Sequence, residues 1–167
     1  GACAPYTSTV QRTEGIELPR RRTFRMSYDI VDPGGKNITS EIFDNDVEKW
    51  FIFSEFCKEV QKELSNRGYR FVYDPGRTAD FLVQVGFSAF YSPTLTEEKM
   101  MEQPFATLMV GRELDDGRFE HIVAMEILAR NPDLSSDEYV VYWKGRTFAT
   151  TERKDVRYSG RPMIHEL

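Results

Sequence analysis

The chain has 167 residues, enough for one ordinary domain and too few for two. Hydrophobic residues make up 40% and charged residues 29%, a balance that excludes an integral membrane protein and a disordered chain. The 22 basic and 27 acidic side chains sum to a net charge of −5, which argues against a nucleic-acid binder. Two cysteines and two histidines leave little material for a metal site or a disulfide framework, so we predict neither a metal nor a cofactor.

The tripeptide Gly1-Ala2-Cys3 is the first candidate site. Bacterial lipoprotein signals end in small residues directly before a cysteine, whose thiol takes the lipid. Acyl chains add about 0.8 kcal/mol of membrane affinity per buried methylene, so several chains anchor a protein firmly. We therefore interpret Cys3 as a candidate lipid-attachment residue, the alternative being an ordinary residue of a chain terminus. Residues 1–21 are then predicted to be a tether and spacer, with a weak strand at 7–12.

The first clear strand covers residues 22–28, in which Phe24, Met26 and Tyr28 alternate with polar side chains. The strongest helix is predicted at 46–67, because Asn45 fits its start and Gly68 fits the left-handed residue just past its end. An apolar seam indicates that this helix packs against a sheet and a second helix. The seam runs through Val47, Trp50, Phe51, Ser54, Cys57, Gln61 and Leu64, and is widened by Phe53, Phe56 and Val60.

The second half of the chain predicts mainly strands. They cover residues 69–73, 80–91, 105–114, 119–129 and 139–150, with a short helix at 95–103 and the start of a final helix at 162–167. Asp115-Asp116-Gly117 is a hairpin signal, and Gly145 is interpreted as a bulge. Short connections between strands predict a single α+β domain over residues 22–167. We expect a mostly antiparallel or mixed sheet of five or six strands, with helices packed on one face.

Four sequence blocks carry a resemblance to a known family. They are RTFRM at 22–26, KELSNRGYR at 62–70, ADFLVQVGF at 79–87 and VVYWKGRTF at 140–148. On these blocks the chain resembles the bacterial envelope lipoproteins grouped as domain of unknown function 4136. The resemblance implies a lipid-anchored α+β protein on the periplasmic side of the Gram-negative envelope, with no established enzymatic activity. Cys3 matches the lipidated cysteine of that family, and Ala4 directly after it implies sorting to the outer membrane.

Groups suited to catalysis are few. His121 and His165 are the only imidazoles, and neither stands in a nucleophile motif such as Gly-x-Ser-x-Gly. His121 is predicted to lie at the sheet edge. The sequence also contains no Walker loop, Cys-x-x-Cys or Gly-x-Gly-x-x-Gly pattern. We therefore predict no catalytic residues, and keep as an alternative a small carboxylate-dependent hydrolase with a lid near residues 92–104.

Two surfaces are candidates for binding. The basic run Arg20, Arg21 and Arg22 could contact phosphate-bearing lipid head groups, although a solvated strand entrance paired with nearby acids is favoured. Trp143 and Tyr142 are predicted on opposite faces of the last strand. One of these faces could stay open and bind a glycan or a protein, or be covered by the last helix, which is favoured. An indole at Trp143 is expected to lie over Gly145, and Asp80 is expected to accept backbone N–H groups.

These observations predict a non-enzymatic, lipid-anchored envelope domain that binds a partner protein, a lipid or a cell-wall component. The membrane would be contacted through the lipid on Cys3, and no nucleic acid is expected. A subunit of a larger assembly is a further hypothesis, favoured if the apolar face of the helix at 46–67 stays exposed.

Overall fold

The computed structural model describes residues 6–13, 19, 21–74, 76–131 and 138–167, so Cys3 and Arg20 lie outside the described residues. The described elements are β1 (Thr7–Arg12), β2 (Thr23–Met26), α1 (Thr39–Asn45), α2 (Val47–Asn66), β3 (Arg70–Phe71), β4 (Phe81–Ser92), α3 (Glu97–Glu102), β5 (Leu108–Glu113), β6 (Phe119–Arg130), β7 (Tyr139–Thr151) and α4 (Arg157–Glu166). Within these residues, no helix combines the length and the apolar character needed to cross a bilayer.

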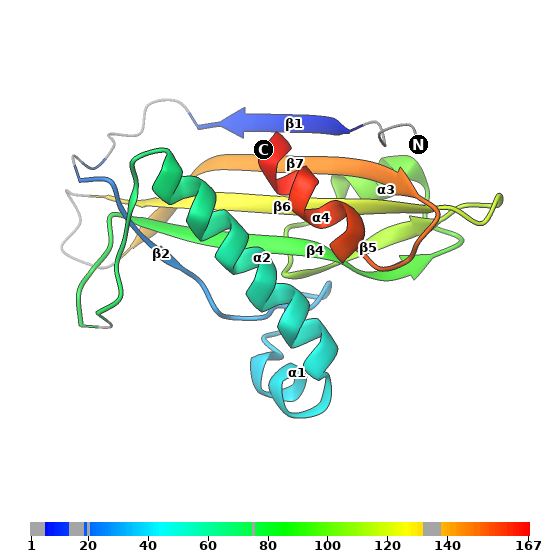
Figure 1. Ribbon diagram of the computed structural model, residues 1–167, viewed down its shortest axis with the longest axis horizontal. Helices are drawn as coiled ribbons and strands as arrows, with labels where there is room; N and C mark the ends of the chain where they lie inside the picture. Colours follow the sequence, from blue (N-terminus) through cyan, green and yellow to red (C-terminus); the bar gives the residue numbers. More distant parts are fainter. Residues whose placement is uncertain (1–5, 14–18, 20, 75, 132–137) are drawn as a thin grey trace.

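The strands form one mixed sheet in the order β1-β7-β6-β5-β4-β2-β3 (Figure 1). β6 runs antiparallel to β7 and to the first half of β4, whereas the second half of β4 pairs in parallel with β5. β2 is parallel to both β3 and β4. The predicted α+β fold with a mixed sheet is confirmed, with seven strands among the described residues where five or six were expected.

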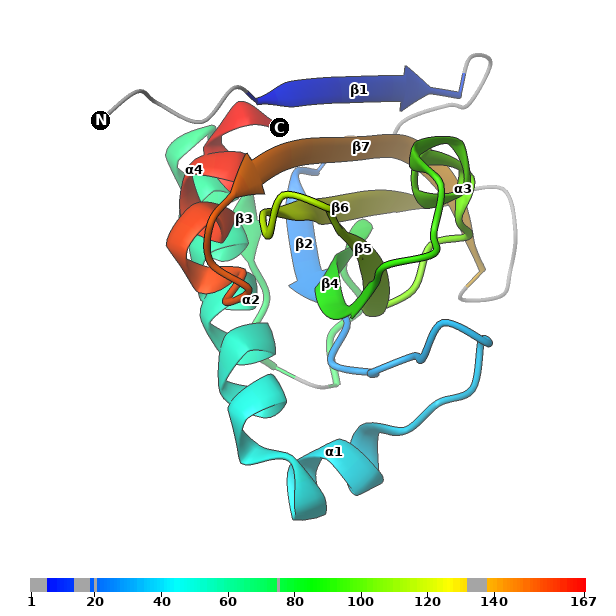
Figure 2. The same cartoon turned by 90° about the vertical axis from the view of Figure 1, so that its right-hand side faces the viewer.

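The two faces of the sheet are covered differently (Figure 2). Helices α2 and α4 lie on one face, which we call the helix face, and α3 lies on the other, which we call the second face. The expectation of helices on one face therefore holds for α2 and α4 but not for α3. Met100 of α3 is fully buried in a small second core, which explains that position. The second core comprises Met100, Ala106, Met109, Ile122, Ala124 and Phe148.

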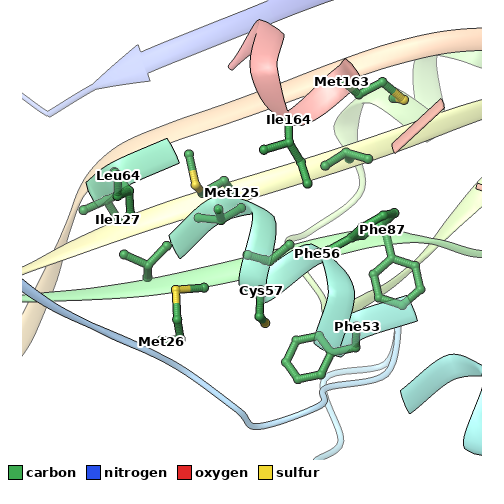
Figure 3. Packing of buried hydrophobic residues seen from close by; sticks show 14 of the residues in the cluster. Met26, Phe53, Phe56, Cys57, Leu64, Phe87, Met125, Ile127, Met163 and Ile164 are labelled. Carbon is green, nitrogen blue, oxygen red and sulfur yellow. The ribbon is translucent and has the colours of Figure 1, made fainter. Parts of the chain in front are cut away.

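Helix α2 supplies more buried side chains to the main core on the helix face than any other described element (Figure 3). Its buried side chains are Ile52, Phe53, Phe56, Cys57, Val60 and Leu64. The buried face of α2 differs from the predicted seam. Val47 and Phe51 belong to that seam, yet they are 54% and 57% exposed. The reason is visible in Figure 1, where the first turns of α2 lie beyond the strands and next to α1. Most of the apolar face of α2 is thus covered, and the large apolar side chains that stay exposed on this helix are Val47 and Phe51.

The ends of α2 follow from local chemistry. The side chain of Asp46, not Asn45, caps the helix by accepting a hydrogen bond from the Lys49 backbone N–H at 3.2 Å. α1 occupies residues for which no helix was predicted. At the other end, Gly68 adopts φ +93°, as predicted for the left-handed residue past the helix.

Cys57, in the middle of α2, is a buried free thiol, and burial raises its pKa to about 12.

Strands β1 and β7 form one margin of the sheet. The predicted weak strand is confirmed as β1, which pairs with β7 from Thr7 to Arg12. Part of the predicted spacer therefore belongs to the sheet. The bulge in β7 lies at Tyr142, between the pairs Leu128–Val141 and Ile127–Trp143, and not at Gly145.

Candidate functional site

A hollow of about 360 Å³ opens on the second face, and we call it the sheet hollow. Its floor comes from β4 and β6, and its walls come from residues 27–37 and 105–107. In Figure 2 the segment after β2 lies on the same side of the sheet as α3. The hollow is lined by Ser27, Asp29, Val31, Asn37, Gln84, Val85, Phe105, Thr107 and Glu126.

The two walls of the sheet hollow are held to each other by hydrogen bonds. The Thr107 hydroxyl donates to the Asp29 carbonyl at 3.1 Å and accepts from the Val31 N–H at 2.9 Å. The backbone N–H groups of Thr107 and Leu108 both donate to the Val31 carbonyl, at 3.0 and 3.1 Å. Thr107 is 3% exposed, so these bonds are shielded from water. The hollow is therefore formed before any ligand arrives.

The floor of the hollow belongs to a row of polar side chains that crosses four strands. Register pairs Gln84 with Glu126, Glu126 with Lys144, and Lys144 with Gln11. We call these four residues the polar row. The Glu126 side chain is only 13% exposed, and burial raises its pKa even though Lys144 and Arg146 act in the opposite direction. Lys144 Nζ lies 3.9 Å from Glu126 Oε1, which leaves room on the carboxylate for another partner.

The lining of the sheet hollow mixes several kinds of hydrogen-bonding group with one ring. Asp29 and Glu126 supply carboxylates, while Asn37 and Gln84 supply amides that both donate and accept. Phe105 adds a half-buried aromatic surface. Such a lining suits a ligand that carries many hydroxyl groups and also has an apolar edge.

His121 sits in a second group of polar side chains, which we call the histidine network. Its Nδ1 lies 2.6 Å from the Tyr91 hydroxyl, and its Nε2 lies 2.7 Å from Thr151 Oγ1 and 2.9 Å from the Arg153 carbonyl. A carbonyl oxygen only accepts, so Nε2 carries the hydrogen and Nδ1 accepts from Tyr91. Burial lowers the pKa of His121 and raises the pKa of Tyr91. Both ring nitrogens are used within the fold, so the network supports the structure and offers no free base.

The prediction that His121 lies at the sheet edge was wrong. The side chain is fully buried, because β6 lies inside the sheet between β7 and its other neighbours. A hollow of about 400 Å³ opens beside Tyr91, between the first turns of α2 and residues 154–156. Charged groups along it pair within the protein: Lys49 with Asp46 at 2.6 Å, and Asp155 with Arg157 at 2.7 Å. These paired charged groups do not point toward a common position in the hollow where a substrate atom could react.

The predicted surface residues are partly engaged in packing. Arg21 and Arg22 are exposed, and the Arg22 guanidinium lies 6.0 Å from the centre of the Tyr69 ring. Trp143 is 9% exposed and belongs to the main core, so the covered alternative that we favoured is confirmed for it. Tyr142 is partly buried and packs against the same core.

Two further local predictions have different outcomes. A Cβ at Gly145 would overlap the Trp143 ring and lie 2.8 Å from Leu167 Cδ2, which confirms an indole lying over Gly145. Asp80 is 6% exposed, and its Oδ2 has no hydrogen-bond partner among the residues that the structure describes. The expected contact from this oxygen to backbone N–H groups is therefore not found. Instead, the Asp80 N–H donates to Thr23 Oγ1 at 3.0 Å.

The segment that was considered as a lid is packed against the second face. Gln103 bridges to β5, since its amide accepts from the Val110 N–H at 2.9 Å and donates to the Val110 carbonyl at 2.8 Å. Arg146 also donates to the Met101 carbonyl at 2.9 Å. The residues that line a hollow of about 320 Å³ beside it include Glu102, Lys144 and Arg146. A lid motion would have to break these bonds.

Sequence reasoning missed the residues of the sheet hollow. Gln84 and Glu126 carried a usable signal, because each is a polar side chain in the middle of an otherwise apolar strand. Asp29, Asn37 and Thr107 carried none, since they come from irregular segments that only the fold brings together.

No family model matches the chain, and no curated protein sequence matches it. Among solved structures, a PelC dodecamer from Paraburkholderia phytofirmans is similar over 96% of this chain and 94% of that chain, with 12% identity and a TM-score of 0.46. A domain of unknown function 4136 family protein from Bacteroides thetaiotaomicron is similar over 96% and 92% of the two chains, with 12% identity and a TM-score of 0.44.

A PDZ domain protein from Parabacteroides distasonis is similar over 96% of this chain but 34% of its own, with 15% identity and a TM-score of 0.43. This chain thus spans about a third of that protein. The family that the four sequence blocks resemble is represented among these similar structures. At this identity, none of the likenesses bears on function.

Proposed function

We propose that the chain is a non-enzymatic, lipid-anchored domain of the bacterial cell envelope that binds a saccharide of the cell wall in the sheet hollow. Its place would be the periplasmic side of the outer membrane, with the lipid on Cys3. The observation that carries the binding proposal is the pre-formed hollow with Gln84 and Glu126 in its floor. Its volume of about 360 Å³ falls in the range of small-ligand pockets, about 300–1,000 Å³.

Charge favours a saccharide over the other ligands that we considered. Asp29 and Glu126 both line the hollow, and two carboxylates disfavour the phosphate of a lipid head group. Neutral hydroxyl groups can donate to the same carboxylates and to the amide oxygens of Asn37 and Gln84. A partner protein would need a broader surface than this hollow provides.

The binding proposal is tested by titrating the full chain with the disaccharide of peptidoglycan and following backbone NMR signals. We expect saturable shifts in β4, β6 and residues 105–107. Gln84→Ala removes hydrogen bonds worth about 0.5–1.5 kcal/mol each, and should weaken binding about 3- to 10-fold. Gln11→Ala is the matched control, because Gln11 stands in the same polar row but outside the hollow. Absence of saturable shifts, or equal affinities of the two variants, would overturn the proposal.

The lipid anchor is tested separately. We expect labelled fatty acid to be incorporated when the full precursor is expressed in a Gram-negative host, and to be lost in a Cys3→Ser variant. Label that persists in this variant would contradict lipidation at Cys3, whatever the outcome of the saccharide titration.

One observation favours a second candidate, carboxylate-dependent hydrolysis of the bound saccharide. Asp29 and Glu126 line the same hollow, and burial raises the pKa of Glu126, as is typical of a general acid. Release of new reducing ends from peptidoglycan by the full chain, with loss of release but not of binding in Glu126→Gln, would establish this alternative. A constant number of reducing ends agrees with binding alone.

A further inference from the structure

A cluster of metal-ligating side chains lies between helices α2 and α4, far from the sheet hollow. Glu59 and Glu63 are one turn apart on α2, and His165 reaches them from α4. His165 Nε2 lies 2.9 Å from Glu59 Oε1, and Nδ1 lies 2.9 Å from Glu63 Oε1. The two glutamate side chains are 14% and 21% exposed, and the histidine side chain is 48% exposed.

The hydrogen-bonding capacity of imidazole makes this cluster unusual. A neutral imidazole carries one N–H, so it can donate to only one of the two carboxylates. The other carboxylate then faces the lone pair of the second ring nitrogen at 2.9 Å, which is repulsive. The arrangement therefore calls for a positive charge between the glutamates, supplied either by a second proton on the ring or by a bound cation.

We propose that Glu59, Glu63 and His165 bind a divalent transition-metal ion of the zinc class. One ligand atom from each residue lies within 4.8 Å of the others. Tetrahedral ligands at about 2.0–2.2 Å from zinc stand about 3.4 Å apart, so closing the site requires the imidazole ring to turn until one of its nitrogens faces both carboxylates. One ring nitrogen and two carboxylate oxygens suit zinc better than magnesium or calcium, which prefer oxygen ligands alone.

The position of the cluster gives the metal a structural consequence. Helix α4 is intrinsically weak, since it contains Pro162 and has no side-chain cap at Val156. Its buried side chains on the helix face include Met163 and Ile164, which are 0% and 3% exposed. A metal shared by α2 and α4 would fix the last turn of α4 to the main core. The inference departs from the expectation of no metal, because Glu59 and Glu63 lie outside the predicted apolar seam and only the fold brings His165 to them.

The test is a titration of the chelator-treated full chain with Zn²⁺, followed by isothermal calorimetry. We expect one saturable site per chain and a rise in Tm on metal addition. Glu63→Gln and His165→Gln should each lower the affinity at least tenfold. Glu55→Gln is the matched control, because Glu55 is an exposed acid on the same helix outside the cluster. Mg²⁺ at the same concentration should give no heat.

Replacement of Zn²⁺ by Co²⁺ provides a readout of geometry, since a tetrahedral site gives visible absorption that surface binding does not. Far-UV circular dichroism in chelator shows whether each variant is folded, and Glu59→Gln replaces any variant that is not. The proposal is overturned if Zn²⁺ binding is not saturable, or if the cluster variants bind as tightly as Glu55→Gln. The charge between the glutamates would then be a proton, and the cluster an ion pair.

Discussion

The two faces of the sheet differ in what covers them and in what they present to solvent. On the helix face, α2 and α4 enclose large apolar side chains such as Phe53, Phe56 and Phe87, which are at most 1% exposed. On the second face, the small core under α3 gives way to the polar row and the sheet hollow. Both faces are built from the same strands, because successive side chains of a strand point in opposite directions. The lesson is that alternation along the same strands gives one sheet an apolar core on one side and a row of polar side chains on the other.

The largest expected effect comes from removing a large side chain from the main core on the helix face. Phe56 is 1% exposed, and its ring lies 5.3 Å from that of Phe87. Phe56→Ala should lower the free energy of unfolding by about 3–5 kcal/mol, measured by urea denaturation, because it leaves a cavity in the main core. Phe51→Ala on the same helix is the control, and should cost about 0.5 kcal/mol or less since Phe51 is 57% exposed. Similar losses in both variants would contradict the described orientation of α2.

A smaller effect is expected where the second face is packed. Gly86 has no room for a side chain, because a Cβ there would overlap the carbonyl oxygen of Ala106 and lie 3.2 Å from Met109 Sδ. Gly86→Ala should lower the free energy of unfolding by about 1–3 kcal/mol and displace the wall at 105–107. At Gly34, where the nearest atom to a Cβ is 3.4 Å away, the same change should alter stability by about 0.5 kcal/mol or less. If the Gly86 variant is as stable as the Gly34 variant, the segment at 105–107 moves to make room for the added Cβ without a loss of stability.

The smallest effect concerns pH and the histidine network. The pKa of His121 is lowered in the folded state by burial, so below about pH 6.5 the unfolded chain binds a proton more readily than the folded chain. The contribution of His121 to stability is therefore present above that pH and is lost as the pH falls. Each unit of difference in pKa corresponds to about 1.4 kcal/mol.

His121→Gln isolates this contribution, because glutamine keeps a donor and an acceptor but does not titrate. The free energy of unfolding should be measured for both proteins from pH 5 to pH 8. We expect the wild-type protein to gain stability relative to the variant as the pH rises. Curves that stay parallel over this range would mean that His121 titrates alike in the folded and unfolded chains.

The sequence predicted most elements of the fold, because alternation and helical spacing are local signals. It located β4, β6 and β7 to within a residue or two, along with the hairpin at Asp115-Asp116-Gly117. It missed α1, which contains one buried residue, Ile42, and looks like a polar loop. It also misplaced the buried face of α2 and the bulge of β7, since neighbouring elements decide both.

The candidate site was less predictable than the fold, for a physical reason. Thr107 and Asp29 are 78 residues apart in sequence, yet one hydrogen bond joins them and shapes the hollow. No local pattern encodes such a contact. The burial of His121 was unpredictable for the same reason, because its hydrogen-bond partners Tyr91 and Thr151 are each 30 residues away in sequence.

The start of strand β1 has a consequence for how the proposed anchor would hold the domain. Thr7 already pairs with Phe148, and it follows Cys3 by four residues. Four residues reach at most about 14 Å when fully extended. A lipid on Cys3 would therefore hold the first residue of β1 within about 14 Å of the lipidated residue at the bilayer surface. Such a short connection would leave the domain much less freedom to move away from the bilayer than a long leader would.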